Sequence, residues 1–163
     1  MRNIQSRVID ASPSSVGALL DTLVSPGQSV WPDKSWPALA LDNGLNPGSR
    51  GGHSAIHYRV AEYEPGRRLR LVFEPDTGID GYHEFVVTEE ALARTRMTHV
   101  IAADVSGRMI WMWPLVIRWM HEALLHDLFD NAERAATGTL SGAAARWSPW
   151  VRLLRRVRAA KRG

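Results

Sequence analysis

The sequence contains no cysteine among its 163 residues. This absence excludes disulfides, thiol nucleophiles and thiolate metal sites, and it fits a reducing compartment. The amino-terminal stretch MRNIQSRVIDASPSS has no apolar segment of the kind that a signal peptide requires. We therefore expect a cytoplasmic location.

Long hydrophobic runs are absent as well. The longest uncharged apolar run is MIWMWPLVI, from Met109 to Ile117, whereas a membrane-spanning helix needs about 20 residues. Arg118, Glu122 and Asp127 follow that run, so we do not expect a membrane span. The glycine-rich patterns GxGxxG and GxxxxGK are also missing, and we expect no nucleotide cofactor.

The remaining composition is that of a globular domain, with 45% hydrophobic and 23% charged residues. The net charge of +3 is unevenly distributed. From Arg146 onward there are seven basic residues and no acid, so the first 145 residues hold 13 basic and 17 acidic side chains, a balance of −4. A role in binding nucleic acid would depend on this tail alone, and we do not expect one.

The amino-terminal half alternates between strand and helix signals. IQSRVIDA predicts a strand, and SPSSVGALLDTL predicts a helix with Ser12 as N-cap and Pro13 in its first turn. Residues 24–47 are rich in proline, glycine and asparagine, which predicts a loop containing Trp31 and Trp36.

Four segments with period-two alternation follow, joined by the turns EPGR, DTGID and a turn near Ala91. They predict an antiparallel meander in which Tyr58 lies opposite Phe73, Phe73 opposite His83, and His83 opposite His99. In this register, Val60 faces Leu71, Leu71 faces Phe85, and Phe85 faces Met97. A slip of one residue would exchange the two faces. The predicted apolar face consists of Ile56, Tyr58, Val60, Leu69, Leu71, Phe73, His83, Phe85, Val87, Met97, His99 and Ile101, and the predicted solvated face of His57, Arg59, Arg68, Arg70, Glu84, Arg96 and Thr98.

A change to helical periodicity predicts a long helix from Trp113 to about Ala136, with Pro114 in its first turn. Its apolar stripe contains Ile117, Met120, His121, Leu124, Leu125, Leu128 and Ala132. A second face carries Glu122, His126, Asp130 and Glu133, and we expect His126 and Asp130 to face water.

The segments VIDASPSSVGALL, GGHSAIHYRVAEYEPGRRLRLVF, GIDGYHEFVV and WPLVIRWMHEALLHDLFDNAE resemble the START-like superfamily (SRPBCC), in particular the bacterial polyketide cyclase/dehydrase group. The resemblance covers roughly residues 3–136. It implies an α+β helix-grip fold, in which a curved antiparallel sheet wraps around a long carboxyl-terminal helix and leaves a hydrophobic cavity. Members bind lipids, sterols, polyketides and other apolar molecules, and a minority catalyse cyclisation or dehydration. We expect this domain at residues 1–137, a linker at 138–145 and a basic tail at 146–163.

Three functions remain open from the sequence. One is binding of a small hydrophobic molecule, another is cyclase or dehydratase chemistry with His83 and His99 as general acid and base, and the third is an interaction module whose cavity is filled by its own side chains. His83 and His99 can equally well be structural, and without a compact ligand motif we expect no metal. His53, after two glycines, is a candidate for the cavity rim. The predicted ligand-binding residues are Trp31, Trp36, Tyr58, Phe73, Phe85, Met97, Trp111, His121 and Leu124.

The basic tail predicts an amphipathic helix. Trp147, Trp150, Val151, Leu154 and Val157 share one face, and Arg152, Arg155 and Arg156 lie opposite. Tryptophan with arginine suits the interface of an anionic membrane, which would make the protein peripheral at the inner face. The alternatives are a solvated tail, or a helix packed on its own domain or on a second copy. The sequence leaves the oligomeric state open.

Overall fold

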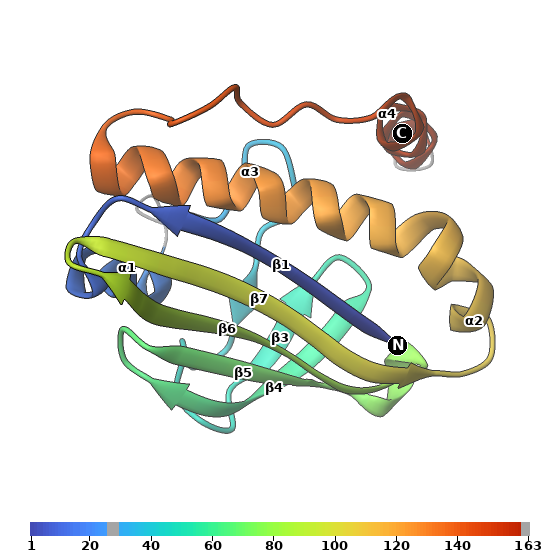
Figure 1. The fold of residues 1–163 in the computed structure, drawn as a ribbon. Helices are drawn as coiled ribbons and strands as arrows, with labels where there is room; N and C mark the ends of the chain where they lie inside the picture. Colours follow the sequence, from blue (N-terminus) through green and yellow to red (C-terminus); the bar gives the residue numbers. More distant parts are fainter. Residues whose placement is uncertain (26–29, 161–163) are drawn as a thin grey trace.

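A computed structural model describes residues 1–25 and 30–160. Residues 26–29 of the predicted loop and residues 161–163 of the predicted tail lie outside the described residues. Seven strands form one antiparallel sheet in the order β1-β7-β6-β5-β4-β3-β2. The sheet curves beneath a long helix that crosses its concave face (Figure 1). The strands are β1 Arg2–Ile9, β2 Ala40–Leu41, β3 Arg50–His53, β4 Ile56–Glu64, β5 Arg68–Phe73, β6 Ile79–Ala91 and β7 Arg94–Val105.

The structure confirms the predicted first helix and the helix in the tail. Ser12 caps α1, where its hydroxyl accepts the backbone N–H of Ser15, and Pro13 is the first helical residue. After α3 the chain runs back along that helix to α4, which is seen end-on in Figure 1. The helical segments are α1 Pro13–Asp21, η1 Pro75–Thr77, α2 Met109–Met112, η2 Trp113–Ile117, α3 Arg118–Thr137 and α4 Pro149–Ala160.

The long helix begins earlier than predicted. Helices α2, η2 and α3 are continuous, so the helix starts at Met109 rather than Trp113, and Pro114 lies inside it rather than in its first turn. Proline has no N–H, and its ring crowds the preceding turn of an α-helix. The chain accommodates it by widening into the π-helical turn η2, where the N–H of Arg118 reaches the carbonyl of Trp113. The carbonyl of Pro114 accepts the indole N–H of Trp119 at 3.0 Å.

The predicted register holds between β4 and β5, where Tyr58 pairs with Phe73 and Val60 with Leu71. It is wrong between the next strands, because His83 pairs with Leu71 on β5 and with Ile101 on β7. Helix η1 takes up residues between β5 and β6, and the last hairpin turns beyond Ala91 with a bulge. Both errors are shifts of two residues, so every side chain keeps its predicted face.

The predicted apolar face is buried except at Ile56, which is partly buried. On the opposite face Glu84 is also buried, contrary to the expectation of a fully solvated face. The side chains of Arg68 and Arg70 cover it and donate to its carboxylate at 2.9 and 3.1 Å. On α3 the predicted stripe likewise faces the sheet, with Leu124, Leu125 and Leu128 at its centre.

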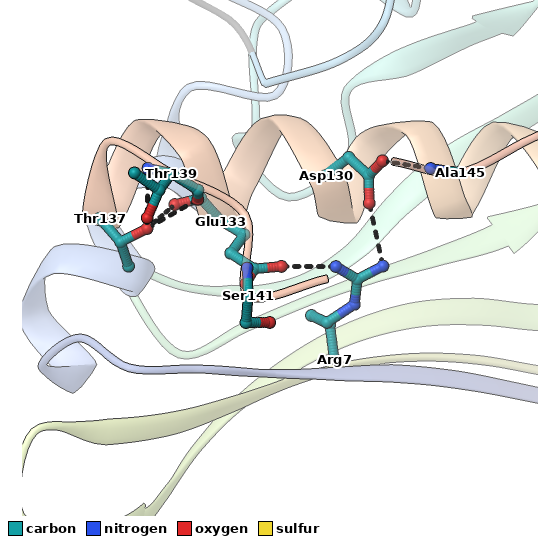
Figure 2. Close-up of polar contacts among 7 residues, drawn as sticks. All are labelled: Arg7, Asp130, Glu133, Thr137, Thr139, Ser141 and Ala145. Atoms are coloured by element: carbon teal, nitrogen blue, oxygen red, sulfur yellow. Dashed lines mark hydrogen bonds and ion pairs between the residues drawn. The ribbon is translucent and has the colours of Figure 1, made fainter. Parts of the chain in front are cut away.

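The expectation that Asp130 faces water is wrong, and the neighbouring Glu133 is buried as well. Figure 2 shows both carboxylates converging on Arg7 of β1, whose guanidinium nitrogens lie 3.0 Å from Asp130 and 2.5 Å from Glu133. Their other oxygens accept the backbone N–H groups of Ala145 and Ser141, at 2.7 and 2.8 Å. The two carboxylates therefore tie the chain after α3 to the helix and, through Arg7, to the sheet.

Candidate functional site

A cavity of about 490 Å³ lies between the concave face of the sheet and the helices. Its walls come from β3 to β7, the loop that carries Trp31 and Trp36, the continuous helix α2-η2-α3, and α4. A second hollow of about 570 Å³ lies around Lys34, Asp127 and Arg134. In that hollow the carboxylate of Asp127 already accepts two indole N–H groups and is committed to the fold. The mainly apolar cavity between sheet and helices is therefore the candidate site.

Most predicted site residues line this cavity: Trp31, Trp36, Phe73, His83, Phe85, His99, His121 and Leu124, together with His53 at the end of β3. Tyr58 and Met97 are fully buried but do not line the cavity. The prediction for Trp111 is wrong, because its side chain is 70% exposed. Trp113 lines the cavity instead. Trp113 lies four residues before Ile117 and seven before Met120, so the 3.6-residue period already places it on the inward-facing stripe, whereas Trp111, two positions earlier, points away.

His83 and His99 form a hydrogen-bonded pair in the cavity wall. His83 Nδ1 lies 3.1 Å from His99 Nε2. The outer nitrogens, His83 Nε2 and His99 Nδ1, are buried and have no hydrogen-bond partner within the described part of the chain. A neutral imidazole has one N–H donor and one lone pair. Whichever ring donates in the shared bond, the pair therefore retains one free N–H and one free lone pair.

His121 of α3 extends this polar spot. Its ring centroid lies 4.8 Å from that of His99, and its Nδ1 is a further buried nitrogen with no partner among the described residues. On the other side, Tyr58 lies 4.8 Å from His83, ring centre to ring centre, and its hydroxyl is 2.7 Å from Nδ1 of His53. The four histidines, which line the cavity, and the buried Tyr58 thus form one polar cluster at an otherwise mainly apolar cavity.

Burial keeps these histidines neutral. Burial, and to a smaller extent the neighbouring His121, lower the pKa of His83 and of His99 well below the usual value. Burial lowers the pKa of His121 to about 3, and burial together with Arg158 lowers the pKa of His53 to about 4. Near neutral pH the cluster therefore offers hydrogen-bond donors and acceptors without positive charge.

Helix α4 completes the wall through Leu154, Val157 and Arg158. The residues before and within α4 are anchored at Asp127, whose Oδ2 accepts the indole N–H groups of Trp36 and Trp147 at 2.7 and 2.8 Å. The guanidinium carbon of Arg155 lies 4.6 Å from the ring centre of Trp36 and 3.9 Å from that of Trp147. Trp147 and Arg155 therefore face the domain, contrary to the prediction that both contact a membrane.

Solved structures with a similar fold bear on this arrangement. CalU16 from Micromonospora echinospora is 17% identical, with a TM-score of 0.59 over 98% of this chain and 84% of that protein. Norcoclaurine synthase from Thalictrum flavum, solved with dopamine and hydroxybenzaldehyde, is 9% identical, with a TM-score of 0.65 over 87% of this chain and 89% of the synthase. The protein has the helix-grip fold. Scans against protein-family models and curated proteins find no match.

In this helix-grip protein the predicted tail packs against the domain. Residues 138–148 are held by Asp130, Glu133 and Asp127, and α4 contacts η2 through the indole of Trp150, which donates to the carbonyl of Leu115 at 2.9 Å. The boundaries predicted at residues 137 and 145 remain predictions. Arg152 and Arg156 are exposed, as the sequence pattern indicates.

Two further properties of the helix-grip domain concern metals and membranes. Among residues 1–25 and 30–160, no group of three His, Cys, Asp or Glu side chains is arranged to hold a metal ion. Within the same residues, no helix is both long and apolar enough to cross a bilayer.

Proposed function

We propose that the protein binds a small, mainly apolar molecule in the cavity and holds a neutral polar group of that molecule at the His83–His99 pair. The observation that carries this proposal is the set of buried nitrogens in a mainly apolar wall for which the described residues supply no hydrogen-bond partner. A buried donor or acceptor without a partner costs about 1–3 kcal/mol. A bound carbonyl or hydroxyl oxygen would recover that cost.

The neutral state of the histidines limits which kind of ligand the cavity can hold. Neutral imidazoles do not compensate a carboxylate or phosphate that leaves water. The cavity arginines are Arg108, just before α2, and Arg158 in α4, and neither is among the charges that shift the pKa of His83 or His99. The aromatic wall, with Trp31, Phe73 and Phe85, suits a flat ligand. A phenol, ketone or alcohol attached to an aromatic or aliphatic body fits both features.

The cavity volume also weighs against the third possibility, a filled interaction module. About 490 Å³ is within the range of small-molecule sites. The neighbour norcoclaurine synthase was solved with an aromatic amine and an aromatic aldehyde. That observation concerns the synthase, and it supports the proposal by showing that this fold accommodates molecules of the proposed size.

Calorimetric titration with 1-naphthol, naphthalene and 1-naphthoate tests the proposal. We expect 1-naphthol to bind most tightly, because only it combines an aromatic body with a neutral hydroxyl. His99→Leu should weaken 1-naphthol binding about tenfold and leave naphthalene binding nearly unchanged. The matched control is His126→Leu, since His126 is exposed on α3. Equal affinity of the His99→Leu variant and the wild type for 1-naphthol would contradict the proposed contact.

A second candidate is cyclase or dehydratase catalysis, and the free N–H and free lone pair of the His83–His99 pair favour it. One outer nitrogen can take the proton alpha to a ketone while the other gives a proton to the leaving hydroxyl. The proton balance is restored through the shared hydrogen bond, and the products are an enone and water.

The dehydration of 4-hydroxy-4-phenylbutan-2-one, followed by the absorbance of the enone, tests this chemistry. We expect acceleration by the wild type and a loss of about 100-fold in His83→Phe and His99→Phe. An identical rate in wild type and both variants would rule out the pair as the catalyst of this reaction.

A further inference from the structure

Exposed apolar side chains gather at one end of the molecule. Within the described residues, ten large hydrophobic side chains are exposed, and eight of them belong to α2, η2, the first turn of α3, and α4. These two helical regions lie at the same end of the molecule (Figure 1), and the hydrogen bond from Trp150 to the carbonyl of Leu115 joins them. We call this set the apolar end: Ile110, Trp111, Met112, Leu115, Trp119, Trp150, Leu153 and Val157.

Positive charge accompanies the apolar end. Arg108, Arg118, Arg152 and Arg156 are exposed on the same segments. The sequences of α2, η2 and α4 contain no aspartate or glutamate. Of the four arginines, Arg118 is paired with Glu122 at 2.9 Å. The apolar end is therefore a hydrophobic surface with a net positive rim, which complements an anionic partner.

The cavity opens within this surface. Met112, Val157 and Arg108 line the cavity and are exposed at the same time, so they mark where it reaches the surface. Ser54 and Ala55 of the β3–β4 turn also line the cavity and are exposed, and the hydroxyl of Ser54 accepts a guanidinium N–H of Arg158 from α4. The mouth thus lies between α2, α4 and that turn.

We propose that the apolar end docks on an anionic lipid bilayer and places the cavity mouth at the membrane surface. Tryptophan, leucine and isoleucine enter the boundary between headgroups and acyl chains, while the arginines contact lipid phosphates. A bilayer is favoured over a protein partner because eight exposed apolar side chains occur with Arg108, Arg152 and Arg156, for which the described part of the chain shows no acidic partner, and they lie beside an opening to a mainly apolar cavity. In this respect the proposal rests on the proposed function, since a ligand of that class dissolves in the bilayer.

Vesicle sedimentation of the full chain tests the docking surface. We expect the wild type to bind vesicles of phosphatidylcholine with phosphatidylglycerol more strongly than vesicles of phosphatidylcholine alone, and to lose binding as salt is raised. The double variant Trp111→Ser/Leu153→Ser should bind about tenfold less, because it removes two exposed apolar side chains from the apolar end.

The matched control is Ile4→Ser/Leu92→Ser, which removes the two exposed apolar side chains outside the apolar end among the described residues. It should bind vesicles like the wild type. The proposal is overturned if the wild type binds no anionic vesicle, or if the two double variants bind vesicles equally. It is also overturned if sedimentation velocity shows a wild-type dimer that Trp111→Ser/Leu153→Ser dissociates, while the wild type does not bind vesicles. Titration of Trp111→Ser/Leu153→Ser with 1-naphthol should be unchanged, so failure of docking and failure of ligand binding are distinguishable.

Discussion

His83 on β6 and His99 on β7 are diagonal neighbours, because each is two residues away from the direct partner of the other, and their rings share a hydrogen bond of 3.1 Å. Directly opposed histidines would sit closer together than this pair. The diagonal arrangement leaves one nitrogen of each ring unshared and buried at the cavity wall.

Because these histidines are buried and neutral, we expect the protein to lose stability on acidification at pH values well above those at which carboxylates titrate. The folded-state pKa values of His83, His99, His121 and His53 are lowered, whereas in the unfolded chain they stay near 6.5. As pH falls below about 6.5 the unfolded state takes up protons that the folded state does not, so the free energy of unfolding decreases. Each histidine contributes up to about 1.4 kcal/mol per pH unit. Urea unfolding between about pH 7.5 and pH 5 measures this slope. His99→Phe should reduce it, and His126→Ala should not. A flat profile in the wild type would contradict neutral burial.

Removal of the carboxylate in Asp127→Ala should loosen α4. The change leaves the indoles of Trp36 and Trp147 without their acceptor and removes the charge beside Arg155. Hydrogen bonds to a charged group contribute about 1.5–3 kcal/mol. We expect faster hydrogen exchange in residues 147–158, with a smaller effect in Asp127→Asn, which keeps one acceptor oxygen. The neighbouring exposed His126 provides the control His126→Ala. Unchanged exchange in Asp127→Ala would show that other contacts hold the helix.

Replacement of Gly17 should weaken the contact between α1 and the β4–β5 turn. A Cβ at Gly17 would lie 2.3 Å from the carbonyl oxygen of Gly66, so the helix or the turn must move. Forcing an extra methyl group into a packed contact costs about 1–3 kcal/mol, and a clash with backbone belongs at the upper end. Thermal unfolding of Gly17→Ala measures this loss. In the control Gly142→Ala the new Cβ meets no described atom within 4 Å, and we expect stability close to that of the wild type.

Replacement of Arg7 should lower stability, because its guanidinium neutralises the two buried carboxylates of α3. In Arg7→Met, Asp130 and Glu133 keep their backbone donors but lose the neutralising guanidinium. Breaking a buried ion pair in this way costs about 3 kcal/mol. The triple change Arg7→Met/Asp130→Asn/Glu133→Gln should recover part of this loss, because the amides still accept the backbone N–H groups without charge. Chemical denaturation compares the three proteins. Equal stability of Arg7→Met and wild type would show that solvent compensates the carboxylates.

The fold was predictable because its determinants are periodic and local. Alternation in the strands from Ile56 to Ile101 assigned the buried face correctly even where the pairing was off by two residues, since a shift of two preserves the face. Ser12 and Pro13 marked the start of α1 in the same local way. The long helix was predicted with the wrong start, because the π turn at Pro114 depends on how the chain relieves the missing N–H.

The site was predictable only in part. His83, His99 and His121 were identified because each lies on an apolar face, but their mutual contact needed the relative position of two strands and a helix. Trp111 and Trp113 differ by two positions in one helix, and the period that places Met120 and Leu124 on the inward stripe also places Trp113 there rather than Trp111. Asp130 was assigned to solvent because its partners, Arg7 and the backbone at Ala145, are distant in sequence.

The sequence by itself thus determined the α+β architecture and which residues belong to each face, since side-chain direction repeats every two residues in a strand and every 3.6 in a helix. Only the tertiary structure decided how the tail is used. Whether tryptophans and arginines of an amphipathic helix meet water, a bilayer or their own domain depends on what lies opposite them. Here Trp147 donates to Asp127 of α3, and Arg155 packs on the rings of Trp36 and Trp147, so both face the domain. Trp150, Arg152 and Arg156 stay at the surface.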